Sequence, residues 1–143
     1  MRLGGITIHG DLTLAGHSDG DAIAHAITDA ILGGAALGDI GEMFPDTEPG
    51  NRGRDSLEML SLAAQRVRSH GWQVAQVDVT VVAERPKLSP HRDAMRSALA
   101  EALGVTPSAV SVKGKTNEGL GWIGRGEGLA CFAVATLLPA EAE

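Results

Sequence analysis

The sequence is poor in residues that cross-link a chain or bind metal clusters through sulfur. Its single cysteine, Cys131, excludes an intrachain disulfide and a multi-cysteine metal cluster, and one thiol is typical of a reducing compartment. We therefore expect a cytoplasmic protein. Tyrosine is absent and aromatic residues make up only 3% of the chain, whereas glycine occurs 19 times without a repeat. This glycine content indicates several loops in which the backbone approaches a ligand.

Long apolar runs and an excess of basic residues are also missing. No stretch approaches the ~18 consecutive apolar residues of a membrane-spanning helix, and residues 1–5 lack the apolar segment of a signal peptide. Lysine and arginine number 12 against 18 aspartates and glutamates, which gives a net charge of −6. This charge argues against binding to nucleic acids or to anionic membranes. A phosphate-bearing ligand must then be held by local donors, metal ions or a few well-placed cations.

The length of 143 residues predicts a single domain over residues 1–143, and the hydrophobic periodicity predicts that it contains both helices and strands. The predicted elements, in chain order, are a strand or hairpin over 3–14, a helix from 22 to about 37, a helix that starts at Asp55 and stops at Gly71, a strand around 74–81, a helix that has Ser89 as its N-cap and ends at Gly104, and strands over 110–113 and 129–138. This order favours an α/β or α+β fold in which helices cover one mixed sheet.

A polar turn, residues 17–21, precedes the first predicted helix. Free N–H groups and the helix dipole at such a position favour phosphate, and His17 could donate to a phosphoryl oxygen. One turn into the helix His25 could bind a metal, and Asp29 follows it at a spacing that would let a carboxylate orient the imidazole. The alternative is an N-cap turn with solvated histidines, because capping residues are expected there in any case.

Two further loops carry polar groups that could bind a ligand. The loop over 38–54 contains Asp39 and Asp46, which suit sugar-like hydroxyls or a metal, or alternatively ordinary Asx turns. In the loop over 83–90 two prolines prevent a continuous strand, so backbone groups could read a base edge and Lys87 could reach a phosphate. The alternative there is a plain strand-to-helix connection with a solvated lysine.

The last candidate segment is the glycine-rich stretch over 114–128. Its Gly-Lys-Thr sequence does not form a P-loop, because Ala109 stands where that motif requires glycine. Thr116 could instead donate to a phosphate, and Glu118 could hold a divalent cation beside it. So many glycines are more than a simple hairpin requires, so we expect a ligand-binding loop.

Together these segments resemble the 2-C-methyl-D-erythritol 2,4-cyclodiphosphate synthase family of the non-mevalonate isoprenoid pathway. The matching segments are 16–29 (GHSDGDAIAHAITD), 38–46 (GDIGEMFPD), 86–87 with 90–91, and 121–131 (GWIGRGEGLAC). Their order and spacing agree along nearly the whole chain. No single motif would establish the resemblance, but four motifs in register are not expected by chance.

The resemblance implies a compact α/β subunit that assembles as a homotrimer with active sites between neighbouring subunits. The implied substrate is a cytidine diphosphate ester of methylerythritol that bears a 2-phosphate. That phosphate attacks the β-phosphorus, CMP leaves and a cyclic diphosphate forms. Zinc and a second ion, magnesium or manganese, are the implied cofactors. An isoprenoid diphosphate is the implied ligand of the trimer's central cavity.

The resemblance also assigns roles to individual residues. His25 is the implied zinc ligand and Glu118 the implied ligand of the second metal, while His17 and Thr116 would stabilise the transition state. The implied substrate-binding residues are His17 and Ser18; then Asp39, Ile40, Gly41, Phe44, Pro45, Asp46, Thr47 and Glu48 for methylerythritol; then Ala83, Pro86, Lys87, Leu88 and Ser89 for cytosine and phosphate; and finally Lys115, Thr116, Asn117, Glu118, Trp122 and Arg125.

One part of the family pattern is missing from this sequence. The family opens with a strand that carries Asp-x-His and supplies two of three zinc ligands, but no Asp-x-His precedes His17. We therefore expect a domain without the family's first strand, an incomplete zinc site and poor turnover. The alternative function is a non-catalytic trimeric protein that binds nucleotide and isoprenoid. A further hypothesis, from the residues alone, is a metal-dependent phosphohydrolase that uses His25, Asp29 and Glu118.

Overall fold

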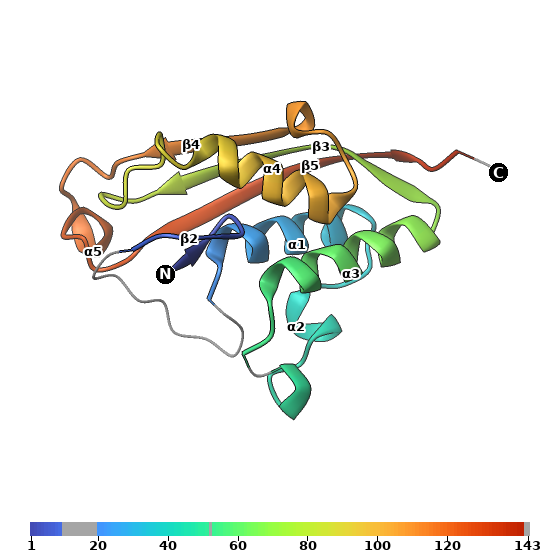
Figure 1. The fold of residues 1–143 in the computed structure, drawn as a ribbon. Helices are drawn as coiled ribbons and strands as arrows, with labels where there is room; N and C mark the ends of the chain where they lie inside the picture. The colour runs from blue at the N-terminus through green and yellow to red at the C-terminus, as the bar shows by residue number, and fades with distance from the viewer. Residues whose placement is uncertain (10–19, 52, 142–143) are drawn as a thin grey trace.

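The computed structural model describes residues 1–9, 20–51 and 53–141 and confirms a mixed α/β fold (Figure 1). Its strands are β1 (Arg2–Leu3), β2 (Ile6–Thr7), β3 (Trp72–Val82), β4 (Val110–Lys115) and β5 (Ala130–Pro139). Its helices are α1 (Ala22–Gly34), α2 (Ile40–Met43), α3 (Ser56–Ser69), α4 (Arg92–Leu103) and α5 (Gly121–Gly124), with 3-10 turns η1 (Pro49–Asn51) and η2 (Pro107–Ala109). Within the described ranges no helix is long and apolar enough to cross a membrane.

The main sheet has three strands in the order β4-β3-β5. β3 runs parallel to β4, with Val77 opposite Val110, and antiparallel to β5, with Val79 opposite Ala133. This sheet is mixed, as predicted. The expectation of a single sheet was wrong for the N-terminal hairpin, in which β1 and β2 form a separate two-stranded sheet. Gly4 and Gly5, with φ of 62° and 81°, turn the chain back at once, and the hairpin contacts α1 and α4 instead.

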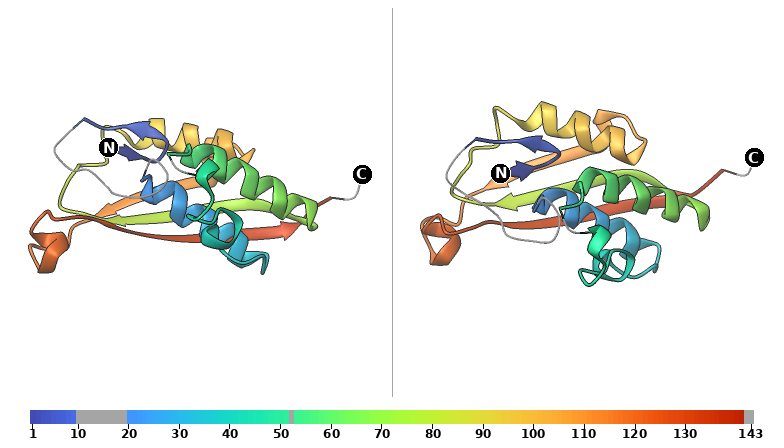
Figure 2. Two further views of the ribbon diagram at one scale, coloured as in Figure 1. Left: turned by 90° about the horizontal axis from the view of Figure 1, so that it is seen from below. Right: turned by 60° about the horizontal axis from the view of Figure 1, so that its bottom comes forward.

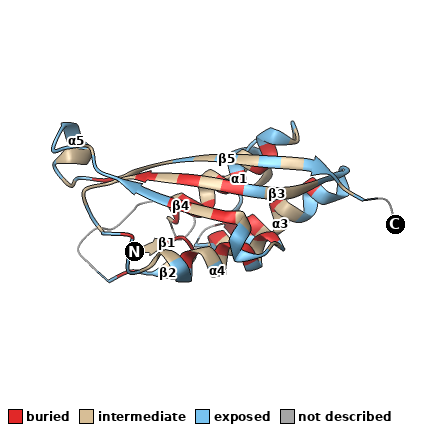
Figure 3. Cartoon of the chain, turned by 90° about the horizontal axis from the view of Figure 1, so that it is seen from above, coloured by how far each residue is buried: buried red, intermediate tan, exposed pale blue. Residues whose placement is uncertain are grey.

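Helices α1, α3 and α4 lie on one face of the main sheet (Figures 1 and 2). Successive residues of a strand point to opposite faces, so Val77, Val79 and Val81 of β3 are buried against these helices. Figure 3 looks onto the opposite face, where the strands lie in front of the helices. On that face β5 carries Phe132 and Val134, which are 64% and 71% exposed. The described part of the chain therefore leaves one sheet face uncovered.

The helix starts agree with the sequence in two cases and differ in one. The Asp21 and Asp55 side chains cap α1 and α3 by accepting hydrogen bonds from backbone N–H groups of the first turns, as their positions predict. The prediction that α4 begins at Ser89 was wrong. Ser89 lies in a turn closed by His91 N donating to Leu88 O, and His91 is the residue that precedes α4.

A residue with a positive φ angle comes shortly after the end of each of the three long helices. Gly71 and Gly104, with φ of 92° and 75°, follow α3 and α4, as predicted. Helix α1 ends at Gly34 rather than at about residue 37, because Ala36 has φ of 57° and turns the chain toward α2. Residues 10–14 of the predicted N-terminal hairpin lie outside the described residues.

Candidate active site

A first pocket, of about 190 Å³, lies where the parallel strands β3 and β4 end together. Loops that follow neighbouring parallel strands meet at one edge of a sheet, so the segment after β3 faces the segment after β4. We call this cavity the β3–β4 pocket. Its lining residues are Val81, Ala83, Glu84, Pro86, Lys87, Leu88, Ser89, Arg92, Gly114, Lys115 and Thr116. The structure thus brings together seven of the predicted substrate-binding residues from two separate loops.

One backbone–backbone hydrogen bond and two bonds to a carboxylate hold the two loops of the β3–β4 pocket against each other. Ala83 N donates to Lys115 O over 2.9 Å, and Glu84 Oε1 accepts from Asn117 N over 3.0 Å and from Gly119 N over 3.3 Å. The Glu84 carboxylate therefore fixes the start of the glycine-rich loop relative to β3.

The composition of the β3–β4 pocket suits a ligand with a flat ring and an anionic tail. Lys87 and Lys115 are exposed cations and Thr116 is an exposed hydroxyl donor, while Leu88 is buried in the wall. A Cβ atom added at Gly114 would lie 3.3 Å from Leu88 Cδ1, so glycine at this position leaves the space open. Ammonium and hydroxyl donors beside an apolar wall can bind a nucleotide diphosphate without a P-loop.

A second pocket, of about 200 Å³, lies among α1, α2 and the start of α3, and we call it the α1–α2 pocket. Its lining residues are His25, Ile40, Gly41, Phe44, Asp46, Asn51 and Met59. His25 Nε2 lies 2.9 Å from Ser56 Oγ, so the imidazole of α1 is held against the first turn of α3. Four predicted methylerythritol residues therefore share a cavity with the predicted zinc ligand.

The predicted pairing between Asp29 and His25 differs from the observed contacts. Asp29 Oδ1 accepts a hydrogen bond of 2.7 Å from Ile40 N, which attaches the start of α2 to α1. Asp39 caps α2 by accepting from Glu42 N over 2.8 Å. Neither carboxylate lines the α1–α2 pocket, but both hold in place α2, whose residues Ile40 and Gly41 line it. Asp29 is a structural acid here.

The remaining predicted residues of the 44–48 segment lie beside the α1–α2 pocket. Pro45 and Glu48 line an adjacent hollow of about 570 Å³, and Thr47 is exposed. His17 and Ser18 lie outside the described residues.

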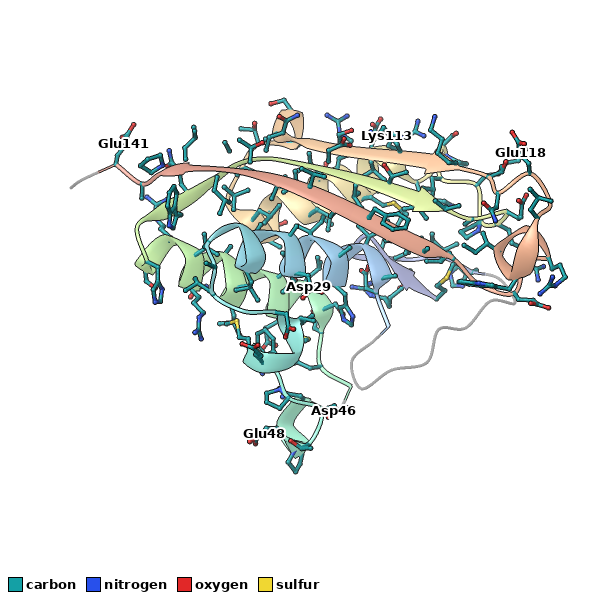
Figure 4. The ribbon with its side chains drawn as sticks, turned by 180° about the vertical axis from the view of Figure 1, so that it is seen from behind. Asp29, Asp46, Glu48, Lys113, Glu118 and Glu141 are labelled. Atoms are coloured by element: carbon teal, nitrogen blue, oxygen red, sulfur yellow. The ribbon has the colours of Figure 1, made fainter. Side chains whose placement is uncertain are left out.

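Glu118 lies far from the α1–α2 pocket. Figure 4 shows Glu118 near one end of the main sheet, whereas Asp46 lies in the segment below α1 and Asp29 lies above Asp46. Glu118 has φ of 53°, and its N–H donates to Thr116 Oγ1 over 3.3 Å. Because Glu118 cannot meet His25 and Asp29 within one chain, the hypothesis of a phosphohydrolase centre built from these three residues was wrong for the single chain.

Helix α5 and the residue after it carry the last two predicted contacts. Trp122 is 50% exposed, and its ring covers Gly128, where an added Cβ atom would lie 2.7 Å from Trp122 Cζ3. Arg125 donates two hydrogen bonds of 3.1 Å to the carboxylate of Glu127 on the surface. Neither Trp122 nor Arg125 lines the two pockets described above.

The described residues do not complete a zinc site. They contain no group of three or more histidine, cysteine, aspartate or glutamate side chains arranged to hold a metal. The α1–α2 pocket contributes two candidate ligands, His25 and Asp46, whereas a catalytic zinc usually takes three protein ligands.

Sequence reasoning missed several residues that line or support the pockets. Glu84 lies in the 83–90 loop and Asn51 in the 38–54 loop, and the sequence already marks both loops as candidate binding segments. Arg92, Ser56 and Met59 gave no such signal. They reach the pockets only because α3 and α4 pack against distant segments.

Comparisons with known proteins agree on one family. A family model described as the YgbB family matches residues 1–138. A 2-C-methyl-D-erythritol 2,4-cyclodiphosphate synthase of Gemmatimonas aurantiaca is 62% identical over 138 residues, which are 96% of this chain and 83% of that protein.

Two solved structures share the fold. The bifunctional IspDF of Campylobacter jejuni superposes with a TM-score of 0.94 at 42% identity, and the match covers 99% of this chain and 38% of that one. IspF of Plasmodium falciparum, solved as a CDP complex, gives a TM-score of 0.87 at 37% identity over 99% of this chain and 85% of that one.

Proposed function

Because the chain belongs to the YgbB family, we propose that it cyclises 4-diphosphocytidyl-2-C-methyl-D-erythritol 2-phosphate to 2-C-methyl-D-erythritol 2,4-cyclodiphosphate and releases CMP. The chain is an enzyme of isoprenoid biosynthesis, a phosphorus–oxygen lyase. One observation carries this assignment. Seven residues predicted to bind the cytidine and phosphate groups line one cavity, in a fold that matches a synthase solved with CDP.

The reaction needs positioning and charge stabilisation more than covalent help from the protein. An oxygen of the 2-phosphate forms a bond to the β-phosphorus, the bond from that phosphorus to the bridging oxygen breaks, and CMP leaves with the bridging oxygen. In the β3–β4 pocket Lys87 and Lys115 supply positive charge beside the diphosphate, and the Thr116 hydroxyl donates to a phosphoryl oxygen. His17 is proposed for the same role from the family resemblance.

Glu118 is the proposed ligand of a magnesium or manganese ion. A single exposed carboxylate fits this role, because magnesium is commonly held by one or two carboxylates together with substrate phosphates. The ion would neutralise negative charge on the diphosphate. For zinc the described residues supply His25 at the α1–α2 pocket without a third ligand, so no step is assigned to zinc.

The separation of the two pockets supports active sites formed between subunits. The β3–β4 pocket and the α1–α2 pocket share no lining residue, and Glu118, near the first pocket, lies well apart from Asp46, which lines the second (Figure 4). A substrate must place its diphosphate at the first region and its methylerythritol at the second. A neighbouring copy of the chain brings the two regions together, and we propose the homotrimer of the family as that assembly.

The uncovered face of the main sheet is the proposed surface of assembly. It presents Phe132 and Val134 of β5, and Lys113 Nζ donates to Asp78 Oδ2 on the same face over 2.9 Å. The other carboxylate oxygen, Asp78 Oδ1, is buried without a hydrogen-bond partner among the described residues. Exposed aromatic and aliphatic side chains around a partly satisfied polar pair are typical of a surface that another subunit covers.

Two further assignments extend the family resemblance. Trp122, Arg125 and Glu127 would border the central cavity of the trimer, where an isoprenoid diphosphate would place its chain against the indole and its charge near the guanidinium. The chain would act as one cytoplasmic domain over residues 1–143. The alternative of a non-catalytic homologue is not favoured, because relatives of this chain are named as synthases.

Phosphorus NMR of the chain with the cytidine diphosphate substrate, zinc and magnesium tests the proposal. Resonances of CMP and of a cyclic diphosphate are expected. In the Thr116→Ala variant the rate should fall about 10²-fold, the cost of removing one transition-state donor. Thr106→Ala, at an exposed threonine before η2, is the matched control and should retain the rate. Release of inorganic phosphate, or intact substrate that nevertheless binds, would contradict the proposed reaction.

A further inference from the structure

Arg54 is a residue to which neither the sequence nor the family resemblance assigns a role. It directly precedes Asp55, the N-cap of α3, and its side chain is 26% exposed. Its guanidinium carbon lies 5.0 Å from the centre of the Phe44 ring, and Nη1 donates to Asn51 Oδ1 over 3.0 Å. On the other side Nε and Nη2 donate to Glu58 Oε1 over 3.1 and 2.8 Å. One side chain therefore links three segments of the region around the α1–α2 pocket.

Two of these three contacts are walls of the α1–α2 pocket. Phe44 and Asn51 both line the pocket and both are buried, with 8% exposure each. Arg54 itself lines the adjacent hollow and not the pocket, so it contacts the two wall residues from behind. A group in this position acts on a bound ligand through Phe44 and Asn51 rather than by direct contact.

Asn51 connects Arg54 to the segment that directly follows Phe44. Its Nδ2 atom donates to Pro45 O over 2.7 Å, and its backbone N–H donates to Glu48 O over 3.0 Å. Arg54 thus holds Asn51, and Asn51 in turn holds the backbone that follows Phe44. Glu58, one turn into α3, anchors this connection to a regular helix.

The chemistry of arginine suits this arrangement. A guanidinium presents several donors in a rigid plane and can stack on an aromatic ring while it donates at its edges, which an ammonium cannot do with the same geometry. Ion pairs with partly exposed partners contribute little to global stability, so the pair with Glu58 is not required for folding. Its effect is to fix side-chain positions.

We propose that Arg54 is a positioning residue that holds the Phe44–Asn51 wall of the α1–α2 pocket in the shape that receives the methylerythritol part of the substrate. This inference rests on the proposed function. Arg54 should therefore affect how the chain binds the substrate and leave binding of CDP unchanged, because CDP is assigned to the β3–β4 pocket.

The test compares wild type, Arg54→Met, Arg54→Lys and a control, Arg96→Met, in the full chain. Arg96, on α4, also connects distant segments through its guanidinium, which donates hydrogen bonds to Val110 O and Pro107 O. It lies outside both pockets. For Arg54→Met we expect KM to rise roughly tenfold with kcat nearly unchanged, below the ~100-fold cost of a 1 Å misplacement of reacting groups. Arg54→Lys should recover only part of this loss. Arg96→Met should leave KM as it is.

Calorimetric titrations with the substrate and with CDP, carried out with a chelator and without divalent metal ions so that the substrate is not converted, give a readout that does not depend on turnover. In wild type the substrate should bind more tightly than CDP, and Arg54→Met should remove most of this difference while CDP affinity stays constant. Equal KM and equal substrate affinity in Arg54→Met and wild type would overturn the role of Arg54 alone. Loss of CDP binding in Arg54→Met would also overturn it. A wild type that binds neither ligand would overturn the proposed function and this inference together.

Discussion

The imidazole of His25 on α1 and the hydroxyl of Ser56 on α3 face each other at 2.9 Å between Nε2 and Oγ. The two residues are 31 positions apart in the sequence, and Ser56 is fully buried. This contact joins α1 to the first turn of α3 beside the α1–α2 pocket, which His25 lines.

The Ser56→Ala variant should lose stability because it removes the hydrogen bond between buried Ser56 and half-buried His25. One intramolecular hydrogen bond typically contributes about 0.5–1.5 kcal/mol. Urea unfolding at pH 7 measures the change. Ser69→Ala is the control, because Ser69 is exposed near the end of α3, and its effect should stay within about 0.5 kcal/mol. Equal stability of the two variants would show that the contact contributes nothing to folding.

Asp21 should contribute more than an ordinary helix cap. Its Oδ1 accepts from Gly4 N and Ala24 N over 2.9 and 3.0 Å, its Oδ2 accepts from Gly5 N over 2.7 Å, and the residue is fully buried. Asp21→Ala should cost about 3 kcal/mol or more, because charge-assisted bonds are each worth about 1.5–3 kcal/mol.

Asp55→Ala is the matched comparison for Asp21→Ala. Asp55 is also an aspartate N-cap, but it is exposed and accepts one backbone bond, from Leu57 N over 2.9 Å. Its loss should cost ~1 kcal/mol. Urea unfolding of both variants gives the difference. Equal costs would mean that the hairpin contacts of Asp21 do not stabilise the fold.

A branched side chain at Gly114 should weaken nucleotide binding. A Cβ atom there would press against Leu88 inside the β3–β4 pocket, so Gly114→Val should raise the Kd of CDP by about tenfold, or ~1.4 kcal/mol. Calorimetry with CDP measures this. Gly33→Ala, at an exposed helical glycine with no atom within 4 Å of the added Cβ, should leave CDP binding unchanged. An unaltered Kd in Gly114→Val would place the nucleotide elsewhere.

A charge on the uncovered sheet face should disrupt assembly. Phe132→Asp introduces a carboxylate among the exposed apolar side chains of β5, where desolvation in a subunit contact opposes it. Light scattering during gel filtration should show a fall from the mass of the oligomer to that of one chain. Gln65→Asp places the same side chain on exposed α3 and should leave the mass unchanged. An unchanged mass in Phe132→Asp would exclude this face from the assembly.

The Cys131 thiol should make the chain less stable at alkaline pH. Burial, with a further contribution from the negative charge of Asp21, raises the pKa of Cys131 from 9.0 to about 12. Between these values the unfolded chain releases the thiol proton and the folded chain keeps it. The free energy of unfolding therefore falls as pH rises through this window, by at most ~1.4 kcal/mol per pH unit.

Comparison with Cys131→Ala isolates this effect. The chain has no tyrosine to titrate in the same range. Urea unfolding at pH 8, 9.5 and 10.5 should show that the variant gains stability relative to wild type as pH rises. Parallel pH dependence of the two proteins would mean that the thiol ionises equally in both states.

The sequence by itself determined the elements that local patterns specify. The alternating valines predicted β3, Asp55 and Gly71 predicted the limits of α3, and the family resemblance predicted seven residues that line the β3–β4 pocket. These features depend on neighbours along the chain, or on two adjacent parallel strands whose ends coincide, so periodicity and motif spacing were sufficient.

Tertiary structure alone decided the partners of His25 and Asp29, the separate N-terminal hairpin and the distance between the two pockets. The sequence placed His25 and Asp29 one helical turn apart, but packing of α1 against α3 and α2 gave them different partners, Ser56 and Ile40. Arg54 likewise reached Phe44 only because the segment between them folds back on itself. Such contacts depend on how helices pack across distant parts of the chain, which hydrophobic periodicity does not encode.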